Sequence, residues 1–93
     1  MFIYLLDIEI KIYDSFSLKD KRKVVKSIID YARNTLKISS AEISANDIKN
    51  FAHLGFVTIS NQNDRAKEIL ENLLIRIEKN YPVEVTNYSI ERI

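Results

Sequence analysis

The chain of 93 residues has no cysteine, one glycine, one proline and one histidine. Without cysteine it can form no disulfide, thiolate nucleophile or cysteine metal site. A single glycine excludes the glycine-rich loops that bind nucleotide phosphates. The single histidine, His53, excludes a catalytic dyad or multi-histidine metal site around it, and we interpret it as a surface residue at a strand end. We therefore expect no catalytic residue, no metal and no cofactor.

The sequence also lacks a long hydrophobic run. Asp7 and Glu9 interrupt the apolar N-terminus, which has no preceding basic region, so it resembles neither a secretion signal nor a membrane span. The absence of disulfides fits a reducing compartment, and we expect a cytoplasmic protein with no membrane partner. Hydrophobic residues make up 46% and charged residues 29% of the chain, as in ordinary globular proteins. The length fits one domain, residues 1–93.

Residues 2–13 alternate strictly, which predicts a half-buried strand. One side is wholly apolar and includes Tyr4 and Leu6, and the other side mixes Ile3 and Leu5 with charged residues. The apolar side is expected to face the core.

Two segments have the apolar spacing of amphipathic helices. The first covers residues 18–36, with Ser17 as its N-cap. The second follows Asn61 or Asn63, either of which can cap it, and ends at Pro82.

Three further strands complete the pattern. Residues 38–46 predict an edge strand in which Ala41 and Ile43 face the helices, and residues 51–60 predict its antiparallel partner. In residues 83–93 the apolar positions change parity midway, so the pattern leaves the register of that strand open. The order βαββαβ predicts an α+β ferredoxin-like sandwich, with a four-stranded antiparallel sheet and both helices on one face.

The sheet face without helices is expected to carry apolar side chains, because the third strand is apolar on both parities. Monomers rarely expose a large contiguous apolar patch. We therefore expect a homodimer that covers part of this face, and the alternative is that only scattered apolar residues are exposed. The predicted interface residues are Ile3, Leu5, Leu54 and Phe56.

This face does not fit an RNA recognition motif. That motif stacks bases on aromatic side chains of the open face, whereas Tyr4 lies on the side that faces the helices. Asp7 and Glu9 lie on the open side, where their carboxylates would repel phosphate. We interpret them as charges at the rim of the sheet or of a dimer.

Positive charge gathers in the first helix. Residues 17–37 contain seven basic and two acidic residues, a net charge of +5, whereas the whole chain carries +1. Lysines near a helix N-terminus are opposed by the helix dipole, which makes the cluster a candidate surface for an anionic partner. The alternative is a solvated helix face. The candidate residues are Lys19, Lys21, Arg22, Lys23, Lys26 and Arg33.

A series of short motifs resembles the YlxP-like family of small bacterial proteins, and the likeness covers almost the whole chain. The motifs, in order, are Ser17-Leu18-Lys19-Asp20-Lys21-Arg22, Ala41-Glu42, Asp47, Leu54-Gly55 and Ser60-Asn61. One departure from the family pattern is the short, glycine-free loop at residues 14–16.

The resemblance implies a ferredoxin-like fold and a family without an established biochemical activity. Its genes are often found near those for ribosome-binding factor A and translation factors, which implies a role in ribosome maturation or translation. It supplies no catalytic residues, and only Lys19, Lys21 and Arg22 carry over as signature positions.

We therefore expect a noncatalytic binding protein whose basic helix contacts the phosphates of rRNA or of a ribosomal subunit. One alternative is a dimeric small-molecule-binding or regulatory domain that uses the sheet face or the subunit interface. A small enzyme is the other alternative, and it would need convergent titratable groups that the sequence does not assemble.

Overall fold

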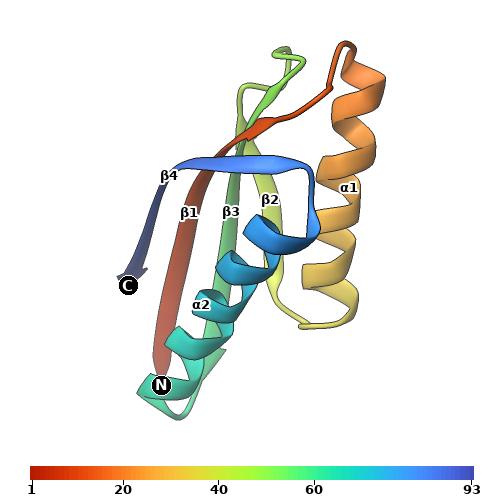
Figure 1. The fold of residues 1–93 in the computed structure, drawn as a ribbon. Helices are drawn as coiled ribbons and strands as arrows, with labels where there is room; N and C mark the ends of the chain where they lie inside the picture. Colours follow the sequence, from red (N-terminus) through yellow and green to blue (C-terminus); the bar gives the residue numbers. More distant parts are fainter.

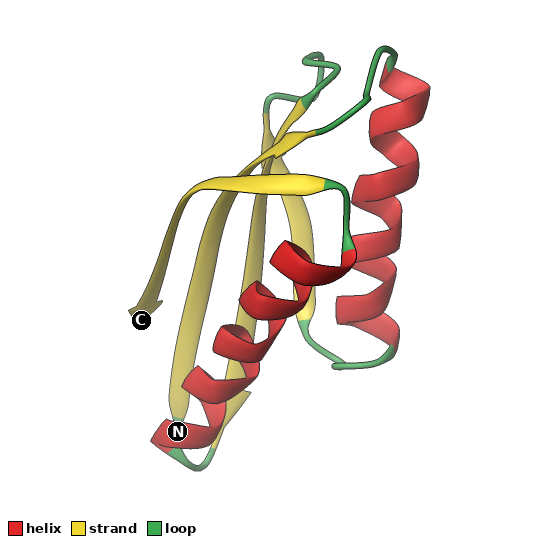
Figure 2. Cartoon of the chain, viewed as in Figure 1, coloured by secondary structure: helices red, strands yellow, loops and turns green.

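The computed structural model describes residues 1–93. Figures 1 and 2 show a twisted sheet with both helices on the same face. The elements are β1 (Phe2–Ile12), α1 (Leu18–Asn34), β2 (Ser39–Ser44), β3 (Phe51–Ser60), α2 (Asn63–Asn80) and β4 (Val83–Arg92). The sheet order is β2-β3-β1-β4, and all three neighbouring pairs are antiparallel. The predicted element order and layer arrangement are confirmed.

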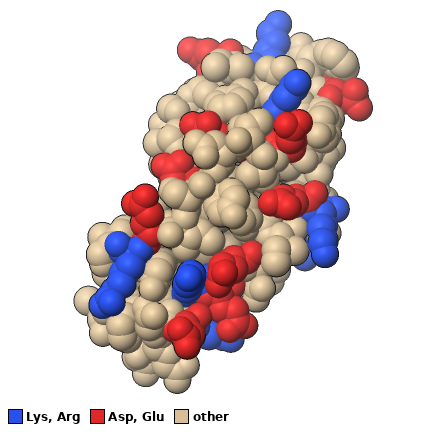
Figure 3. Space-filling model, turned by 60° about the vertical axis from the view of Figure 1, so that its left-hand side comes forward, with Lys and Arg blue, Asp and Glu red and all other residues tan.

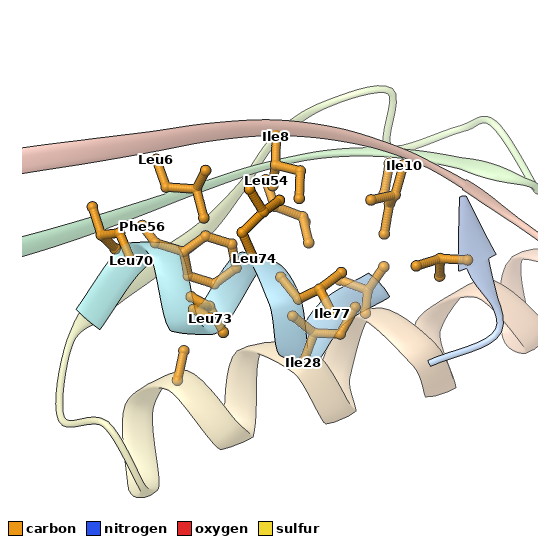
Figure 4. Close-up of a cluster of buried hydrophobic side chains, with 14 of the residues drawn as sticks. Leu6, Ile8, Ile10, Ile28, Leu54, Phe56, Leu70, Leu73, Leu74 and Ile77 are labelled. Atoms are coloured by element: carbon orange, nitrogen blue, oxygen red, sulfur yellow. The ribbon is translucent and has the colours of Figure 1, made fainter. Parts of the chain in front are cut away.

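The core lies between the sheet and the two helices. Figure 4 shows side chains of β1 and β3 pointing toward Leu73 and Ile77 of α2 and Ile28 of α1. The apolar side of β1 is buried, as the strict alternation predicts. Its buried residues are Tyr4, Leu6, Ile8, Ile10 and Ile12.

The predicted parity of β3 is wrong. Leu54 pairs with Ile8 and Phe56 with Leu6, so both point toward the helices, and each is 0% exposed. Neither residue can belong to an interface on the open face, because the helices already cover both (Figure 4). The other side of β3, with Val57, faces away from the helices.

The predicted parity of β2 is also wrong. Glu42 pairs with Leu54, on the helix side of the sheet, whereas Ala41 and Ile43 are exposed. A carboxylate is tolerated on the covered side because the Nζ of Lys21, in α1, lies 3.0 Å from Glu42 Oε2. Because of this ion pair, the side of β2 with the carboxylate faces the helices and the side with Ile43 faces solvent, the reverse of the predicted arrangement.

The N-terminus of α1 follows the prediction. Ser17 Oγ accepts a hydrogen bond of 3.1 Å from the amide of Asp20. In α2 the cap is Gln62, which makes no side-chain capping bond, and Asn63 Oδ1 instead accepts a 2.6 Å bond from the Tyr4 hydroxyl. As expected, the helix ends just before Pro82. Neither helix is long and apolar enough to cross a membrane.

A β-bulge explains the parity change in β4. Glu9 of β1 pairs with Asn87, but Ile10 pairs with Val85, so Thr86 is an extra residue in β4. The Thr86 hydroxyl donates a 3.2 Å hydrogen bond to the carbonyl of Glu9. β4 bends sharply in Figure 1, and both halves of the strand keep apolar residues on the helix side.

Candidate anion-binding surface and open sheet face

One flank of α1 is rich in exposed cations. The helix buries Val25, Ile28 and Ala32 against the rest of the domain, and its Tyr31 ring stacks under the Arg76 guanidinium of α2 at 3.7 Å. The remaining side of α1 faces solvent and carries the exposed cations. We call them the basic flank: Lys19, Arg22, Lys23, Lys26 and Arg33.

The basic flank is a stripe along one side of α1. At 3.6 residues per turn its members fall within an arc of about 100°, and Lys19 and Arg33 are about 21 Å apart along the axis. Asp30 lies within the same arc and forms an ion pair of 2.5 Å with Lys26. Because one carboxylate faces five cations, the stripe presents net positive charge.

The stripe ends at a basic hollow beside the C-terminus of α1. Arg33 Nη2 donates a 2.6 Å hydrogen bond to the Ser40 carbonyl on β2, which fixes the guanidinium at the sheet edge. The hollow has a volume of about 450 Å³ and is lined by Arg33, Lys37, Ile38, Ser39 and Ser40. Lys37 is absent from the predicted site because it lies beyond the last turn of the helix.

Lys21 does not belong to this surface. Its side chain is 3% exposed, and its Nζ donates a 2.5 Å hydrogen bond to the Ala45 carbonyl besides the ion pair with Glu42. The prediction that Lys21 contacts an anion is corrected, because its ammonium is enclosed between α1 and the end of β2. Lys21 therefore supports the fold, although it lies inside the signature motif.

The other helix offers no comparable stripe. The helix α2 carries four acidic and four basic residues, which are mixed along its length. On the face drawn in Figure 3, Asp and Glu side chains are interspersed with Lys and Arg side chains, with no area of basic residues alone. The α2 cations provide a natural comparison for the basic flank. They are Arg65, Lys67, Arg76 and Lys79.

The open sheet face carries a polar chain that the sequence does not predict. His53 Nε2 lies 2.8 Å from Asp7 Oδ1, and His53 Nδ1 lies 2.9 Å from Ser44 Oγ. Three adjacent strands contribute one residue each, so only the register brings them together. Hydroxyl, imidazole and carboxylate follow one another as in a serine triad, but the two ring nitrogens are exchanged, because a triad has the serine at Nε2 and the carboxylate at Nδ1. These three side chains cross-link the strands.

Next to this polar chain the face is apolar along β1 and β3, whereas Glu9 of β1 and Ser89 and Glu91 of β4 are polar. Ile3 pairs with Ile59 and Leu5 with Val57 across β1 and β3, and Ile59 is 64% exposed. Ile3 and Leu5 therefore lie where the sequence places them, and Val57 and Ile59 occupy the face expected for Leu54 and Phe56.

A shallow hollow lies within this apolar area. Its volume is about 190 Å³, and Leu5, Ile43 and Val57 line it. The absence of a side chain at Gly55 makes room for Ile43, since a Cβ there would lie 3.0 Å from Ile43 Cδ1.

Comparison with known structures supports the fold. A designed protein with a ferredoxin fold superposes with a TM-score of 0.62 at 18% identity, covering 100% of this chain and 84% of the designed chain. The protein YJCS superposes with a TM-score of 0.58 at 12% identity and 98% coverage of both chains. The domain therefore has the ferredoxin-like fold.

Comparison of sequences identifies the family. The uncharacterized protein YlxP of Bacillus subtilis is 31% identical over 75 residues, which cover 81% of this chain and 82% of that protein. This similarity confirms the resemblance indicated by the motifs. Residues 3–90 match the family described as "Protein of unknown function (DUF503)", and the chain belongs to that family.

Proposed function

We propose that this protein is a noncatalytic RNA-binding protein that acts in ribosome maturation or translation, with the basic flank of α1 as its contact surface. The observation that carries the proposal is the stripe of five exposed cations along about 21 Å of one helix. Hydrogen bonds from lysine and arginine to phosphate oxygens position a protein on RNA without reading its bases. The partner is an rRNA segment or a ribosomal subunit.

The mechanism predicts a dependence on salt. Each phosphate contact releases condensed counterions, so the logarithm of affinity falls with the logarithm of salt concentration by about 0.7 per contact on single strands. Five contacts would give a slope of about −3.5. A protein that bound through apolar contacts alone would show a much flatter dependence.

The test is co-sedimentation with ribosomal subunits across a salt series, with two charge-reversed variants. The first carries Lys19→Glu, Arg22→Glu and Lys23→Glu on the basic flank. The matched control carries Arg65→Glu, Lys67→Glu and Lys79→Glu on α2. Both variants change the net charge by the same amount, so a difference between them reports on the position of the charges.

We expect the α1 variant to lose three contacts, which flattens the slope by about 2 on single-stranded RNA. Its thermal midpoint should be unchanged or slightly higher, because acidic residues near a helix N-terminus interact favourably with the dipole. The α2 control should retain binding. Equal binding by both variants, or binding by wild type that ignores salt, would refute the phosphate-contact mechanism.

A homodimer is a second candidate, favoured by the apolar half of the open face. Ile3, Leu5, Val57 and Ile59 are contiguous on two paired strands, and no helix covers them. A two-fold axis through this area would bring identical patches together and bury them. The hollow beside Leu5 could then receive a partner side chain or, in a regulatory domain, a small apolar ligand.

Sedimentation of two isoleucine variants tests the dimer. Ile59→Glu adds a charge to the open face, and Ile75→Glu adds the same charge to α2, where Ile75 is 49% exposed. We expect wild type and Ile75→Glu to sediment as dimers at micromolar concentration and Ile59→Glu as a monomer. If the wild type sediments as a monomer, a dimer that covers the open sheet face is excluded.

A further inference from the structure

An aromatic side chain is exposed at the start of the basic flank. Phe16 is 77% exposed, although its backbone is held firmly on both sides. Its amide donates a 3.1 Å hydrogen bond to Asp20 Oδ2. The preceding Ser15 is buried and donates a 2.5 Å hydrogen bond to the Lys49 carbonyl of the β2–β3 loop. At the top of Figure 1 that loop lies beside the β1–α1 loop, which contains Ser15 and Phe16.

Packing within the domain does not explain Phe16. An apolar residue before an N-cap commonly packs against the fourth helical residue, but that position in α1 is Lys21, whose ammonium binds Glu42 and Ala45. The Phe16 ring therefore has no apolar partner at the fourth position of the helix. A rigid backbone that presents an unpacked ring loses little conformational freedom when the ring binds a ligand.

The charges around Phe16 favour an uncharged group at this end. Asp14 and Asp20 place carboxylates close to Phe16 in the chain, and Lys19 is the nearest cation along the helix. Phosphate is better matched by Arg22 and Lys23 in the next turn of α1, which form no ion pair with a carboxylate. A flat, neutral, aromatic group suits the Phe16 ring.

We propose that Phe16 stacks on an unpaired base of the RNA whose phosphates follow the basic flank, so that the protein selects single-stranded over duplex RNA. This inference rests on the proposed function and adds the form of the RNA. Bases in a duplex stack on each other, whereas bases of loops and single strands are free to stack on protein aromatic rings. Such stacking is tolerant of sequence.

An anionic membrane is the competing occupant, since an exposed aromatic beside lysines can insert into lipid. Helices that lie on membranes bury an apolar face in the lipid. In α1 the apolar face is buried in the core of this domain, and the basic flank offers charged side chains and no apolar one to a membrane surface. These features favour RNA.

The test uses tryptophan as a probe, because the chain contains none. Phe16→Trp places a single indole at the stacking position, and its fluorescence is measured on titration with oligouridylate of about 12 nucleotides. An RNA duplex of equal length and vesicles of phosphatidylglycerol serve as the comparison ligands. The control is Phe2→Trp, which places the indole at the N-terminal end of β1, whereas Phe16 follows the C-terminal end of that strand.

We expect oligouridylate to quench the indole fluorescence of Phe16→Trp strongly and the duplex to quench it weakly, with little change in the control. Introduced into the wild-type sequence, Phe16→Ala should weaken binding to oligouridylate by about 10-fold or more. It should not change how steeply the affinity falls with salt concentration. Fluorescence of Phe16→Trp that responds to vesicles and not to oligouridylate would overturn the inference in favour of a membrane.

The outcomes separate the inference from the function on which it rests. If the α1 charge variant loses binding but Phe16→Ala binds both RNA forms like wild type, the phosphate contacts stand and the stacking is wrong. If wild type binds no RNA at low salt, the proposed function fails and the inference fails with it. Equal affinity of wild type for duplex and single strand would also overturn the selectivity.

Discussion

Lys21 provides a direct test of whether a basic signature residue binds a ligand or supports the fold. We expect Lys21→Met to destabilise the domain, because methionine keeps most of the apolar stem but lacks the ammonium. The substitution removes the hydrogen bond to the Ala45 carbonyl and the ion pair with Glu42. Glu42 would then remain on the covered side of β2 without a cation.

The magnitude follows from these two losses. A hydrogen bond to a charged group contributes about 1.5–3 kcal/mol, and removing one partner of a fully buried pair costs about 3–5 kcal/mol. The Glu42 side chain is 27% exposed, so water screens part of its charge. We expect a loss of about 2 kcal/mol, which for a domain of this size lowers the thermal midpoint by about 8–16 °C.

The assay is urea denaturation of Lys21→Met, Glu42→Gln and the double variant, with Lys19→Met as the exposed control. The cycle should give a coupling free energy of about 1 kcal/mol between Lys21 and Glu42, and Lys19→Met should change stability by less than about 0.5 kcal/mol. If Lys21→Met is as stable as Lys19→Met and loses RNA binding instead, the assignment of Lys21 to the fold is refuted.

Other substitutions test the remaining features. We expect Phe56→Ala to destabilise the chain by about 3–5 kcal/mol in thermal unfolding, because the ring is fully buried; retained stability would contradict the observed parity of β3. Ser17→Ala should cost about 1 kcal/mol through loss of the cap, with the unfolding midpoint as the readout. Gly55→Ala should cost less than about 1 kcal/mol, since the half-exposed Ile43 side chain can move away from the new methyl group. Finally, we expect Ser44→Ala to leave any background hydrolysis of p-nitrophenyl acetate unchanged; a loss of turnover would contradict the noncatalytic proposal and assign the chemistry to Ser44, His53 and Asp7.

The sequence predicts the fold well wherever one physical signal dominates. Strict alternation in β1 fixes which side is buried, and the apolar stripes of α1 and α2 fix the helices. The β4 register is left open because a single extra residue, Thr86, shifts the alternation, and a one-residue shift reverses every side chain beyond it. The pattern contains the shift, but only the pairing with Glu9 and Ile10 shows where it occurs.

The sheet parities of β2 and β3 fail for different reasons. In β3 both sides are apolar, so alternation contains no information about which side faces the helices. In β2 the pattern misleads, because the covered side carries Glu42 and the exposed side carries Ile43. Periodicity arguments assume that charges face water, and a carboxylate that finds a cation on a distant helix violates that assumption.

The same long-range pairing decides how the basic cluster should be interpreted. Charge counting along α1 gives each lysine equal weight, yet the helix places Lys21 toward the sheet and its neighbours Lys19 and Arg22 toward solvent. Lys21 and Glu42 lie far apart in the sequence, and their contact gives both residues a role in the fold. The exposed cations have no such reason within the domain, apart from the contacts of Lys26 and Arg33. Because neither folding nor helix electrostatics requires Lys19, Arg22 or Lys23 at the N-terminal turns of α1, these three residues carry the argument for an external anion.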